Sequence, residues 1–173
     1  MNDILKITKE VLSQNFLWKL HKFTQNNKQP SFVNYFYYPE NVVGSSNAIF
    51  QFDLDENLKN ELAKELIEKN LILFKPKTWK THINIFSRGS FIPWHDDGSY
   101  KKTITIYLNE QWDLNWGGAF LYSKMDFSKN NINCIYPEYN TAISFAPPLL
   151  HTTTLTTNNS LMRKSLQIFI NEF

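Results

Sequence analysis

The chain has 173 residues, a formal net charge of +2 and a single cysteine, Cys134. This length predicts one domain over residues 1–173 with a core that needs no disulfide. Lysine and glutamate are interspersed, which gives no electrostatic reason to expect binding to nucleic acid. No stretch approaches the roughly 20 apolar residues of a membrane span, and the first twenty residues contain no apolar signal core. With one unpaired cysteine, these features predict a cytoplasmic protein.

The first 70 residues contain two helical patterns. Apolar residues recur at helical spacing from Ile4 to Leu20 and predict an amphipathic helix over residues 3–20. Asp55 is placed to cap a second helix that ends near Asn70. Between the helices the sequence predicts a loop, a strand, a turn and a short strand, over residues 24–30, 31–38, 44–47 and 49–52.

From residue 71 onward the apolar pattern has a period of two, as in β-strands. Candidate strands cover residues 71–74, 79–87, 91–97, 102–108, 119–123, 141–145, 151–156 and 165–170. Two helices followed by about eight short strands predict an α+β, mainly β, fold. Eight antiparallel strands in two facing sheets would form a double-stranded β-helix, or jelly roll. We therefore expect a helical support region over residues 1–70, packed on one sheet of a jelly-roll core over residues 71–173.

One strand carries the first candidate metal ligands. His95 and Asp97 are two residues apart, so on an extended strand both side chains point to the same face. Two histidines and one carboxylate on one face of a metal ion, with other positions open, suit non-haem Fe(II). His151 begins a later strand, and strands distant in sequence are neighbours in a jelly roll. It is therefore the candidate third ligand.

Arg163 lies twelve residues after His151, at the start of the last predicted strand. An arginine that points into a barrel needs an anion, because an unpaired buried charge is very costly. Its planar guanidinium matches a carboxylate through two hydrogen bonds. A dicarboxylate such as 2-oxoglutarate could bind iron at its keto-acid end and Arg163 at the other, supported by the hydroxyl of Tyr107 or Ser165.

Each of these features has an ordinary structural explanation when taken alone. A His-x-Asp triplet can be a surface turn, a histidine near a strand start can be a hydrogen-bonded structural residue, and Arg-x-Ser can lie on a solvated edge. The order is more informative: His-x-Asp, about fifty residues, a histidine, about a dozen residues, an arginine, and a closing apolar strand.

In that order the chain resembles the Fe(II)- and 2-oxoglutarate-dependent dioxygenases, specifically their prolyl-hydroxylase-like branch. The resemblance rests on three segments between about residues 80 and 171. The most specific feature is the motif Tyr107-Leu108-Asn109, then Trp112, then Gly117-Gly118. The three segments are residues 86–97, residues 104–122 and residues 151–166.

The resemblance implies a role for each matching residue. His95, Asp97 and His151 would be the iron ligands, Arg163 would bind the distal carboxylate of 2-oxoglutarate, and Tyr107 would hydrogen-bond near that carboxylate. The implied cofactors are Fe(II), 2-oxoglutarate as co-substrate, and O2, with ascorbate as a further candidate.

The chain departs from the family pattern at Phe86, where the family often has a tyrosine. Asn84, two residues earlier on the same strand, is a candidate to replace the missing hydroxyl contact. Related halogenases lack the carboxylate of the triad, so the presence of Asp97 favours hydroxylation. Asp96 should point away from the site on a regular strand.

The expected reaction is hydroxylation of an unactivated C–H bond, in a prolyl residue of a peptide or protein, with release of succinate and CO2. Trp94, Tyr100 and Trp116 are the candidate substrate-binding aromatics, and Trp79 and Tyr122 could join them or all could be core residues. The alternative substrate is a free amino acid or small metabolite. Alternatives of another class are a cupin-like metal-binding jelly roll and a non-catalytic module. His82 is expected to be structural. The sequence does not determine the oligomeric state.

Overall fold

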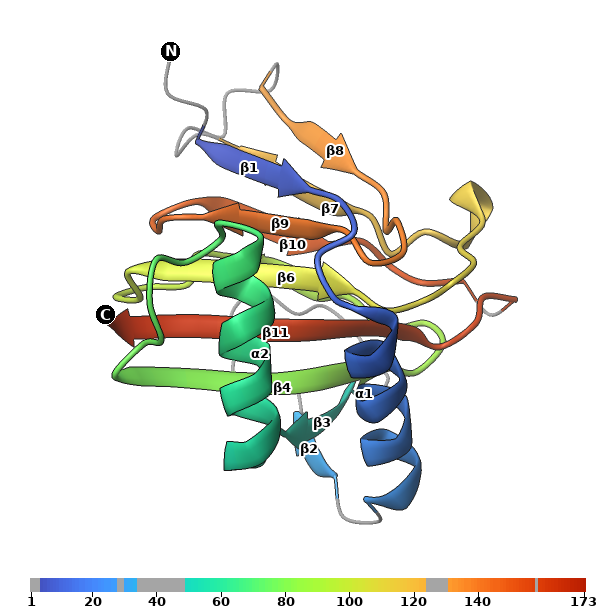
Figure 1. Cartoon of the computed structure of the whole chain (residues 1–173). Helices are drawn as coiled ribbons and strands as arrows, with labels where there is room; N and C mark the ends of the chain where they lie inside the picture. The colour runs from blue at the N-terminus through green and yellow to red at the C-terminus, as the bar shows by residue number, and fades with distance from the viewer. Residues whose placement is uncertain (1–3, 28–29, 34–48, 124–130, 158) are drawn as a thin grey trace.

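The computed structural model describes residues 4–27, 30–33, 49–123, 131–157 and 159–173, and its body is two antiparallel sheets that face each other. The predicted turn at residues 44–47 and most of the predicted strand at 31–38 lie outside the described residues. The larger sheet has the strand order β1-β9-β6-β11-β4-β3-β2, and the smaller has the order β5-β10-β7-β8. This is the predicted mainly β double-stranded β-helix with helices on one sheet (Figure 1).

The strands of the larger sheet come from both ends of the chain. They are β1 (Leu5–Thr8), β2 (Ser31–Val33), β3 (Ile49–Asp53), β4 (Thr78–Phe86), β6 (Lys102–Tyr107), β9 (Ala142–Phe145) and β11 (Arg163–Glu172). The strands of the smaller sheet are β5 (Ile92–His95), β7 (Phe120–Ser123), β8 (Asn133–Ile135) and β10 (Leu150–Thr153). The predicted helical support region thus also contributes three strands to the larger sheet.

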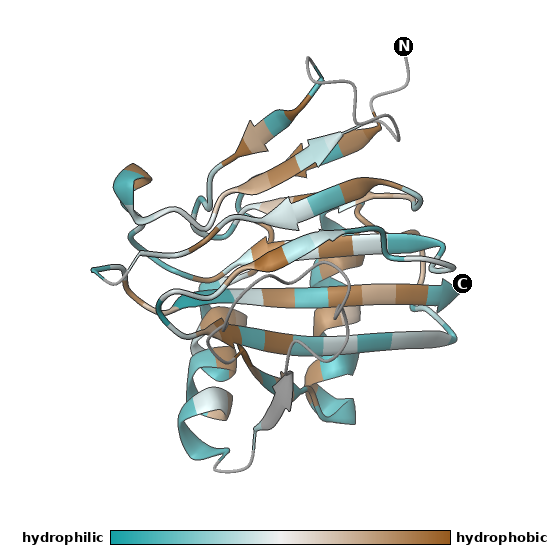
Figure 2. Cartoon of the chain, turned by 180° about the vertical axis from the view of Figure 1, so that it is seen from behind, coloured by the Kyte–Doolittle hydropathy of each residue, from teal (hydrophilic) through white to brown (hydrophobic). Residues whose placement is uncertain are grey.

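The central strand β11 shows how the alternating sequence serves two environments. Leu166, Ile168 and Ile170 are fully buried in the core that lies between the larger sheet and the helices. The residues between them point to the opposite face, toward the smaller sheet, because successive side chains on a strand alternate. Figure 2 shows this alternation of apolar and polar residues along the strands. One face of β11 therefore supports the fold and the other is available to a site.

Two helices cover the outer face of the larger sheet, α1 (Gln14–Asn26) and α2 (Glu56–Glu68) (Figure 1). Each begins where an N-cap side chain accepts a hydrogen bond from a backbone N–H of the first turn: Ser13 from Phe16, and Asp55 from Leu58. Glu65 of α2 also accepts hydrogen bonds from the backbone N–H and hydroxyl of Ser13, at 2.8 and 2.5 Å. The two helices are thereby tied to each other as well as to the sheet. No helix in the described part of the chain is long and apolar enough to span a membrane.

The predicted helix over residues 3–20 is wrong in its first half. Residues 5–8 form β1 at the edge of the larger sheet, paired with β9 from Leu5–Phe145 to Thr8–Ala142. Glu10 then has a positive φ of 52°, which no continuous helix allows, and Val11 and Leu12 enter the core. The regularly spaced apolar residues therefore belong to two elements, a short strand and the first turns of a helix. The helix itself runs to Asn26, into the predicted loop over residues 24–30.

A second correction concerns residues 71–74, which were predicted as a strand. They follow α2 as an irregular segment: Leu71 and Ile72 are buried, whereas Leu73 is 82% exposed. Backbone N–H groups of Leu71 and Ile72 both bond to the carbonyl of Leu66, so they close the helix instead of joining a sheet. The sequence also gave no sign of the short strand β8. The remaining predicted strands occur, most with ends shifted by one to three residues.

Candidate active site

Three potential metal ligands meet on the inner face of the smaller sheet. His151 on β10 lies directly opposite His95 on β5 in the strand pairing. Asp97 Oδ1 lies 3.6 Å from His95 Nε2 and 3.8 Å from His151 Nε2. Ligand bonds of about 2.0–2.2 Å to a single metal ion are compatible with these separations. The structure therefore brings the predicted residues 95, 97 and 151 into one cluster.

The two imidazole rings are held so that their Nε2 atoms face the cluster. His95 Nδ1 lies 2.8 Å from the carbonyl oxygen of Pro93, and His151 Nδ1 lies 2.8 Å from that of Leu149. A carbonyl can only accept, so each Nδ1 carries the proton and each Nε2 offers a lone pair. Burial, followed by the neighbouring His95, lowers the pKa of His151, an effect that Asp97 partly opposes. His151 is therefore neutral at pH 7, as a metal ligand must be.

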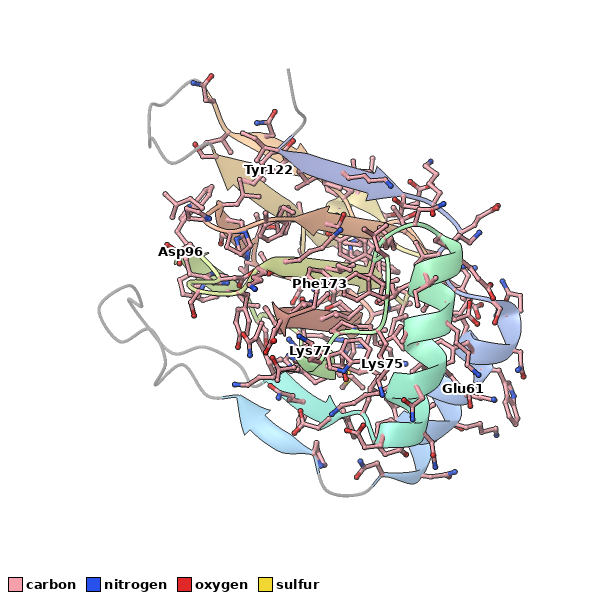
Figure 3. All side chains as sticks on the ribbon, turned by 60° about the vertical axis from the view of Figure 1, so that its left-hand side comes forward. Glu61, Lys75, Lys77, Asp96, Tyr122 and Phe173 are labelled. Carbon is pink, nitrogen blue, oxygen red and sulfur yellow. The ribbon has the colours of Figure 1, made fainter. Side chains whose placement is uncertain are left out.

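Asp97 reaches the cluster by a route that the sequence did not predict. Strand β5 ends at His95, so Asp97 belongs to the turn that follows and not to the strand. Asp96 makes this turn by accepting a hydrogen bond from the Gly98 N–H at 2.7 Å. Asp96 is exposed and lies on the side of the molecule away from α1 and α2 (Figure 3), whereas Asp97 Oδ2 is buried with no hydrogen-bond partner in the described structure.

Arg163 occupies the deep end of the space between the sheets. It is 1% exposed, and its guanidinium lies over the rings of Phe86 and Tyr107, at 4.7 and 5.2 Å from their centroids. Its Nε donates to the carbonyl of Gly118 at 3.0 Å, and one terminal nitrogen donates to the hydroxyl of Ser165 at 3.3 Å. Among the described residues no carboxylate pairs with it. A buried guanidinium without a carboxylate partner is suited to bind the carboxylate of a ligand.

The side chains around Arg163 leave hydrogen-bonding capacity unused. The Tyr107 hydroxyl and the Asn84 side-chain oxygen are buried, and neither has a hydrogen-bond partner in the part of the protein that is described. Burial raises the pKa of Tyr107 to about 12, although the charge of Arg163 opposes the shift. Tyr107 thus stays protonated and able to donate. Buried polar groups are normally paired, so these atoms indicate a polar ligand.

The cluster and Arg163 line the same cavity, which has a volume of about 860 Å³. Tyr100, one of the candidate substrate residues, also lines it, and so does Trp79. Trp94 and Trp116, the other two candidate substrate residues, are not among the described residues that line this cavity. Trp94 follows Pro93 and precedes His95 on β5, where neighbouring side chains point to opposite faces. Trp116 ends the short 3-10 helix η3 (Leu114–Trp116) and packs edge-on against Trp112, with ring centroids 5.4 Å apart.

His82 is one of the cavity residues that the sequence did not place there. The histidine was expected to be structural, but it lies on the cavity face of β4 beside Asn84. Burial lowers the pKa of His82 to about 4, so its imidazole is neutral at pH 7. The available signal was strand alternation, because Asn84 was already a candidate and His82 precedes it by two residues.

The donor set fits Fe(II). Two neutral imidazole nitrogens and one carboxylate oxygen form a facial set, and the unpaired Asp97 Oδ2 leaves the carboxylate free of competing hydrogen bonds. Such a set leaves coordination positions for other ligands and is typical of non-haem Fe(II) oxygenases. A dicarboxylate co-substrate needs a metal ion for one end and a cation for the other. Arg163, which lines the same cavity, is that cation.

This combination of jelly roll, facial triad and buried arginine defines an oxygenase of the iron-dependent class. The family model of the 2OG-Fe(II) oxygenase superfamily matches residues 81–171, and the chain belongs to this family. Fe(II), 2-oxoglutarate and O2 are accordingly its cofactor and co-substrates. No curated protein sequence matches the chain at a significant level.

Solved structures with the same fold include several prolyl hydroxylases. A Pseudomonas putida prolyl-4-hydroxylase has a TM-score of 0.69 at 13% identity, covering 98% of this chain and 93% of the other. A Trichoplax adhaerens prolyl hydroxylase, in complex with a hypoxia inducible factor peptide fragment, has a TM-score of 0.70 at 15% identity, covering 98% and 84%. A viral collagen prolyl hydroxylase from Paramecium bursaria Chlorella virus-1, in complex with 2-oxoglutarate, has a TM-score of 0.64 at 14% identity, covering 98% and 96%.

Proposed function

We propose that residues 1–173 act as one dioxygenase domain that hydroxylates an unactivated C–H bond, in a prolyl residue of a peptide or protein, with release of succinate and CO2. The observation that carries this proposal is the facial cluster of His95, Asp97 and His151 in the same cavity as a buried arginine that lacks a carboxylate partner in the described structure.

The iron ligands in this proposal are His95 Nε2, His151 Nε2 and Asp97. The two histidines need little reorganisation to bind, because the hydrogen bonds from Nδ1 to backbone carbonyls already fix each ring and its protonation. Asp97 supplies the negative charge that partly neutralises the ion.

Arg163 is proposed to bind the distal carboxylate of 2-oxoglutarate. Its guanidinium is held by the carbonyl of Gly118 and packs against the rings of Phe86 and Tyr107, so its orientation is set before the co-substrate arrives. Tyr107 would donate its unpaired hydroxyl to the same carboxylate, and Ser165 would support it. Asn84 lies on the neighbouring strand, opposite Ser165, and would provide the polar contact that Phe86 cannot make.

When bound, Fe(II), 2-oxoglutarate and O2 supply the oxidising chemistry that C–H hydroxylation needs. The contribution of the chain is to orient and to exclude water. Phe120 stacks on the ring of His151 at 5.1 Å between centroids, and Phe145 packs edge-on against it at 5.2 Å. These apolar rings shield one side of the metal cluster and leave the cavity side open to substrate.

A prolyl substrate is supported by three structural neighbours that are described as prolyl hydroxylases, one of which was solved with a peptide. The size of the cavity is consistent with co-substrate and a substrate side chain together, because typical ligand sites measure about 300–1,000 Å³.

The test uses two adjacent aspartates as a matched pair. Protein with Asp97→Asn and protein with Asp96→Asn are titrated without oxygen, first with Fe(II) and then with 2-oxoglutarate, and the visible metal-to-ligand charge-transfer band is recorded. We expect the band in wild type and in Asp96→Asn, and its loss or marked shift in Asp97→Asn. Succinate formation in air should follow the same order. No band in wild type, or the same band and turnover in Asp97→Asn, would overturn the proposal.

A further inference from the structure

The sequence motif that is most specific to the family surrounds Arg163. It comprises Tyr107-Leu108-Asn109 at the end of β6, then Trp112, and Gly117-Gly118 shortly before β7. Two of its members contact the arginine side chain directly. The ring centroid of Tyr107 lies 5.2 Å from the guanidinium carbon, and the carbonyl of Gly118 accepts a hydrogen bond from Nε at 3.0 Å. The hydrogen bonds of Asn109 and Trp112 lead to the same arginine by two different routes.

Asn109 holds the backbone on both sides of Arg163. Its Nδ2 donates to the carbonyl of Met162 at 2.9 Å, and its Oδ1 accepts from the backbone N–H of Lys164 at 2.6 Å. The backbone N–H of Leu108 also donates to the carbonyl of Lys164, at 3.0 Å. A side-chain amide has both a donor and an acceptor, so it can pair with a carbonyl and an N–H as a neighbouring strand would. Asn109 therefore fixes the backbone at the point where the arginine side chain leaves it.

This support comes where the strand pairing does not reach. Arg163 is the first residue of β11, but on the β6 side the pairing begins at Ser165, opposite Tyr107. Met162, immediately before the strand, is 49% exposed. The ends of elements open more readily than their interiors, because fewer contacts hold them. The side chain of Asn109 thus supplies, beside the arginine, the hydrogen bonds that β6 supplies farther along β11.

Trp112 acts on the other end of the arginine. Its indole N–H donates to the carbonyl of Gly117 at 2.9 Å, and the carbonyl of the next residue, Gly118, receives the Nε–H of Arg163. Both glycines have positive φ, 68° and 67°, which glycine adopts readily but does not hold by itself. A Cβ at position 118 would lie 2.9 Å from the arginine Cδ and 3.0 Å from the indole ring, so Gly118 is packed between the two side chains. The indole therefore fixes the turn whose carbonyl orients the guanidinium.

From these contacts we infer that Asn109 and Trp112 are positioning residues for 2-oxoglutarate. Asn109 fixes the backbone of Arg163, and Trp112 fixes the carbonyl that orients its guanidinium. The inference rests on the proposed function, in which Arg163 binds the distal carboxylate. A carboxylate bound through two parallel hydrogen bonds needs the guanidinium plane in one orientation, so a small displacement of the arginine weakens both bonds.

The test compares two oxo acids that differ at one end. 2-Oxopentanoate has the same keto-acid group as 2-oxoglutarate but carries a methyl group in place of the distal carboxylate. Each acid is titrated into the anaerobic Fe(II) protein, and its dissociation constant is taken from the charge-transfer band. We expect wild type to bind 2-oxoglutarate at least about 100-fold more tightly, because the arginine offers charge-assisted hydrogen bonds to that acid alone.

The variants remove one support at a time. Asn109→Ala and Trp112→Phe should each weaken binding of 2-oxoglutarate by about 2- to 10-fold, the usual effect of one hydrogen bond, and leave binding of 2-oxopentanoate unchanged. The controls are Asn115→Ala, at an exposed position of η3, and Trp18→Phe, at an exposed position of α1, and both should bind the two acids as wild type does. A residue with a purely structural role would affect both acids or neither. An equal loss for both acids, or no loss for 2-oxoglutarate, would therefore overturn the role of the residue concerned.

A double-mutant cycle tests whether the effect passes through the arginine. Once Arg163→Met has removed the guanidinium, adding Asn109→Ala should weaken 2-oxoglutarate binding no further. A further loss of the same size as in the single variant would show that Asn109 acts independently of the arginine, and would overturn the inference.

The wild-type titrations separate this inference from the proposed function. No band with 2-oxoglutarate in wild type overturns the proposed function and the inference with it. Equal affinity of wild type for the two acids overturns the arginine as the anchor, and the inference with it. A wild-type preference for 2-oxoglutarate that persists undiminished in Asn109→Ala and Trp112→Phe overturns the inference alone. A variant that keeps its band with 2-oxopentanoate has an intact metal site, so a loss confined to 2-oxoglutarate reports on the arginine and not on folding.

Discussion

Replacement of Arg163 by methionine should separate ligand binding from stability. The guanidinium makes two hydrogen bonds to protein oxygens and has no carboxylate partner within the described structure. A methionine of similar length would keep the packing against Phe86 and Tyr107 and remove the buried charge. Replacing buried charges by apolar residues is often neutral or stabilising. We therefore expect the free energy of unfolding without 2-oxoglutarate to fall by less than about 2 kcal/mol, or to rise.

The effect on 2-oxoglutarate should be much larger. A carboxylate bound through two charge-assisted hydrogen bonds gains roughly 1.5–3 kcal/mol from each. Loss of both, about 3–6 kcal/mol, weakens binding by about two to four powers of ten, because 1.4 kcal/mol corresponds to a factor of ten. Wild-type protein with ligand at a hundred times its dissociation constant gains about 2.7 kcal/mol of stability. Arg163→Met should gain almost none at the same concentration.

The assay is urea unfolding of the anaerobic Fe(II) protein with and without 2-oxoglutarate. Arg88→Met is the control, since Arg88 is exposed, lies outside the cavity lining and is the only other arginine in the sequence. The control should retain the full ligand-induced gain. An equal gain in Arg163→Met and wild type would refute the assignment of the arginine as the co-substrate anchor.

Three further predictions concern core packing, 2-oxoglutarate binding and the pH dependence of stability. Leu62→Ala should lower the free energy of unfolding by about 2–5 kcal/mol, because Leu62 is a fully buried residue of α2. Leu73→Ala, at an 82% exposed position, should change it by no more than about 0.5 kcal/mol, and urea unfolding of the two variants tests the difference. Gly118→Ala should weaken 2-oxoglutarate binding more than Gly98→Ala does: both glycines have positive φ, but a Cβ at position 118 would lie 2.9 Å from the buried arginine, and one at position 98 meets nothing within 4 Å. The pKa of His82 is lowered to about 4 in the folded protein, so the unfolded chain binds the proton more readily, and stability should fall as the pH drops from about 6.5 to 4, by up to about 3 kcal/mol. Unfolding measured across that range should show a smaller loss in His82→Gln, and an identical loss would contradict the assigned pKa.

Much of the site could be predicted from the sequence, because the chemistry of the site depends on residue types in a fixed order. His95, Asp97, His151 and Arg163 were identified as ligand and anchor candidates from spacing and from the resemblance, and the structure places all four around one cavity. The long strands were equally visible, since β6 and the central parts of β4 and β11 largely alternate between polar and apolar residues. These features are local, and a local pattern can be read directly from the chain.

The tertiary structure decided what depends on contacts between distant segments. Residues 5–8 form a strand because β9 offers them a partner more than a hundred residues away, although their spacing suits a helix. Asp97 reaches the metal cluster through a turn, and His82, which was expected to be structural, lines the cavity. Alternation fixes which residues share a face, but the identity of the facing element follows only from long-range packing. The sequence by itself therefore determined which residue types form the site, and the fold determined how they meet and which other residues line their cavity.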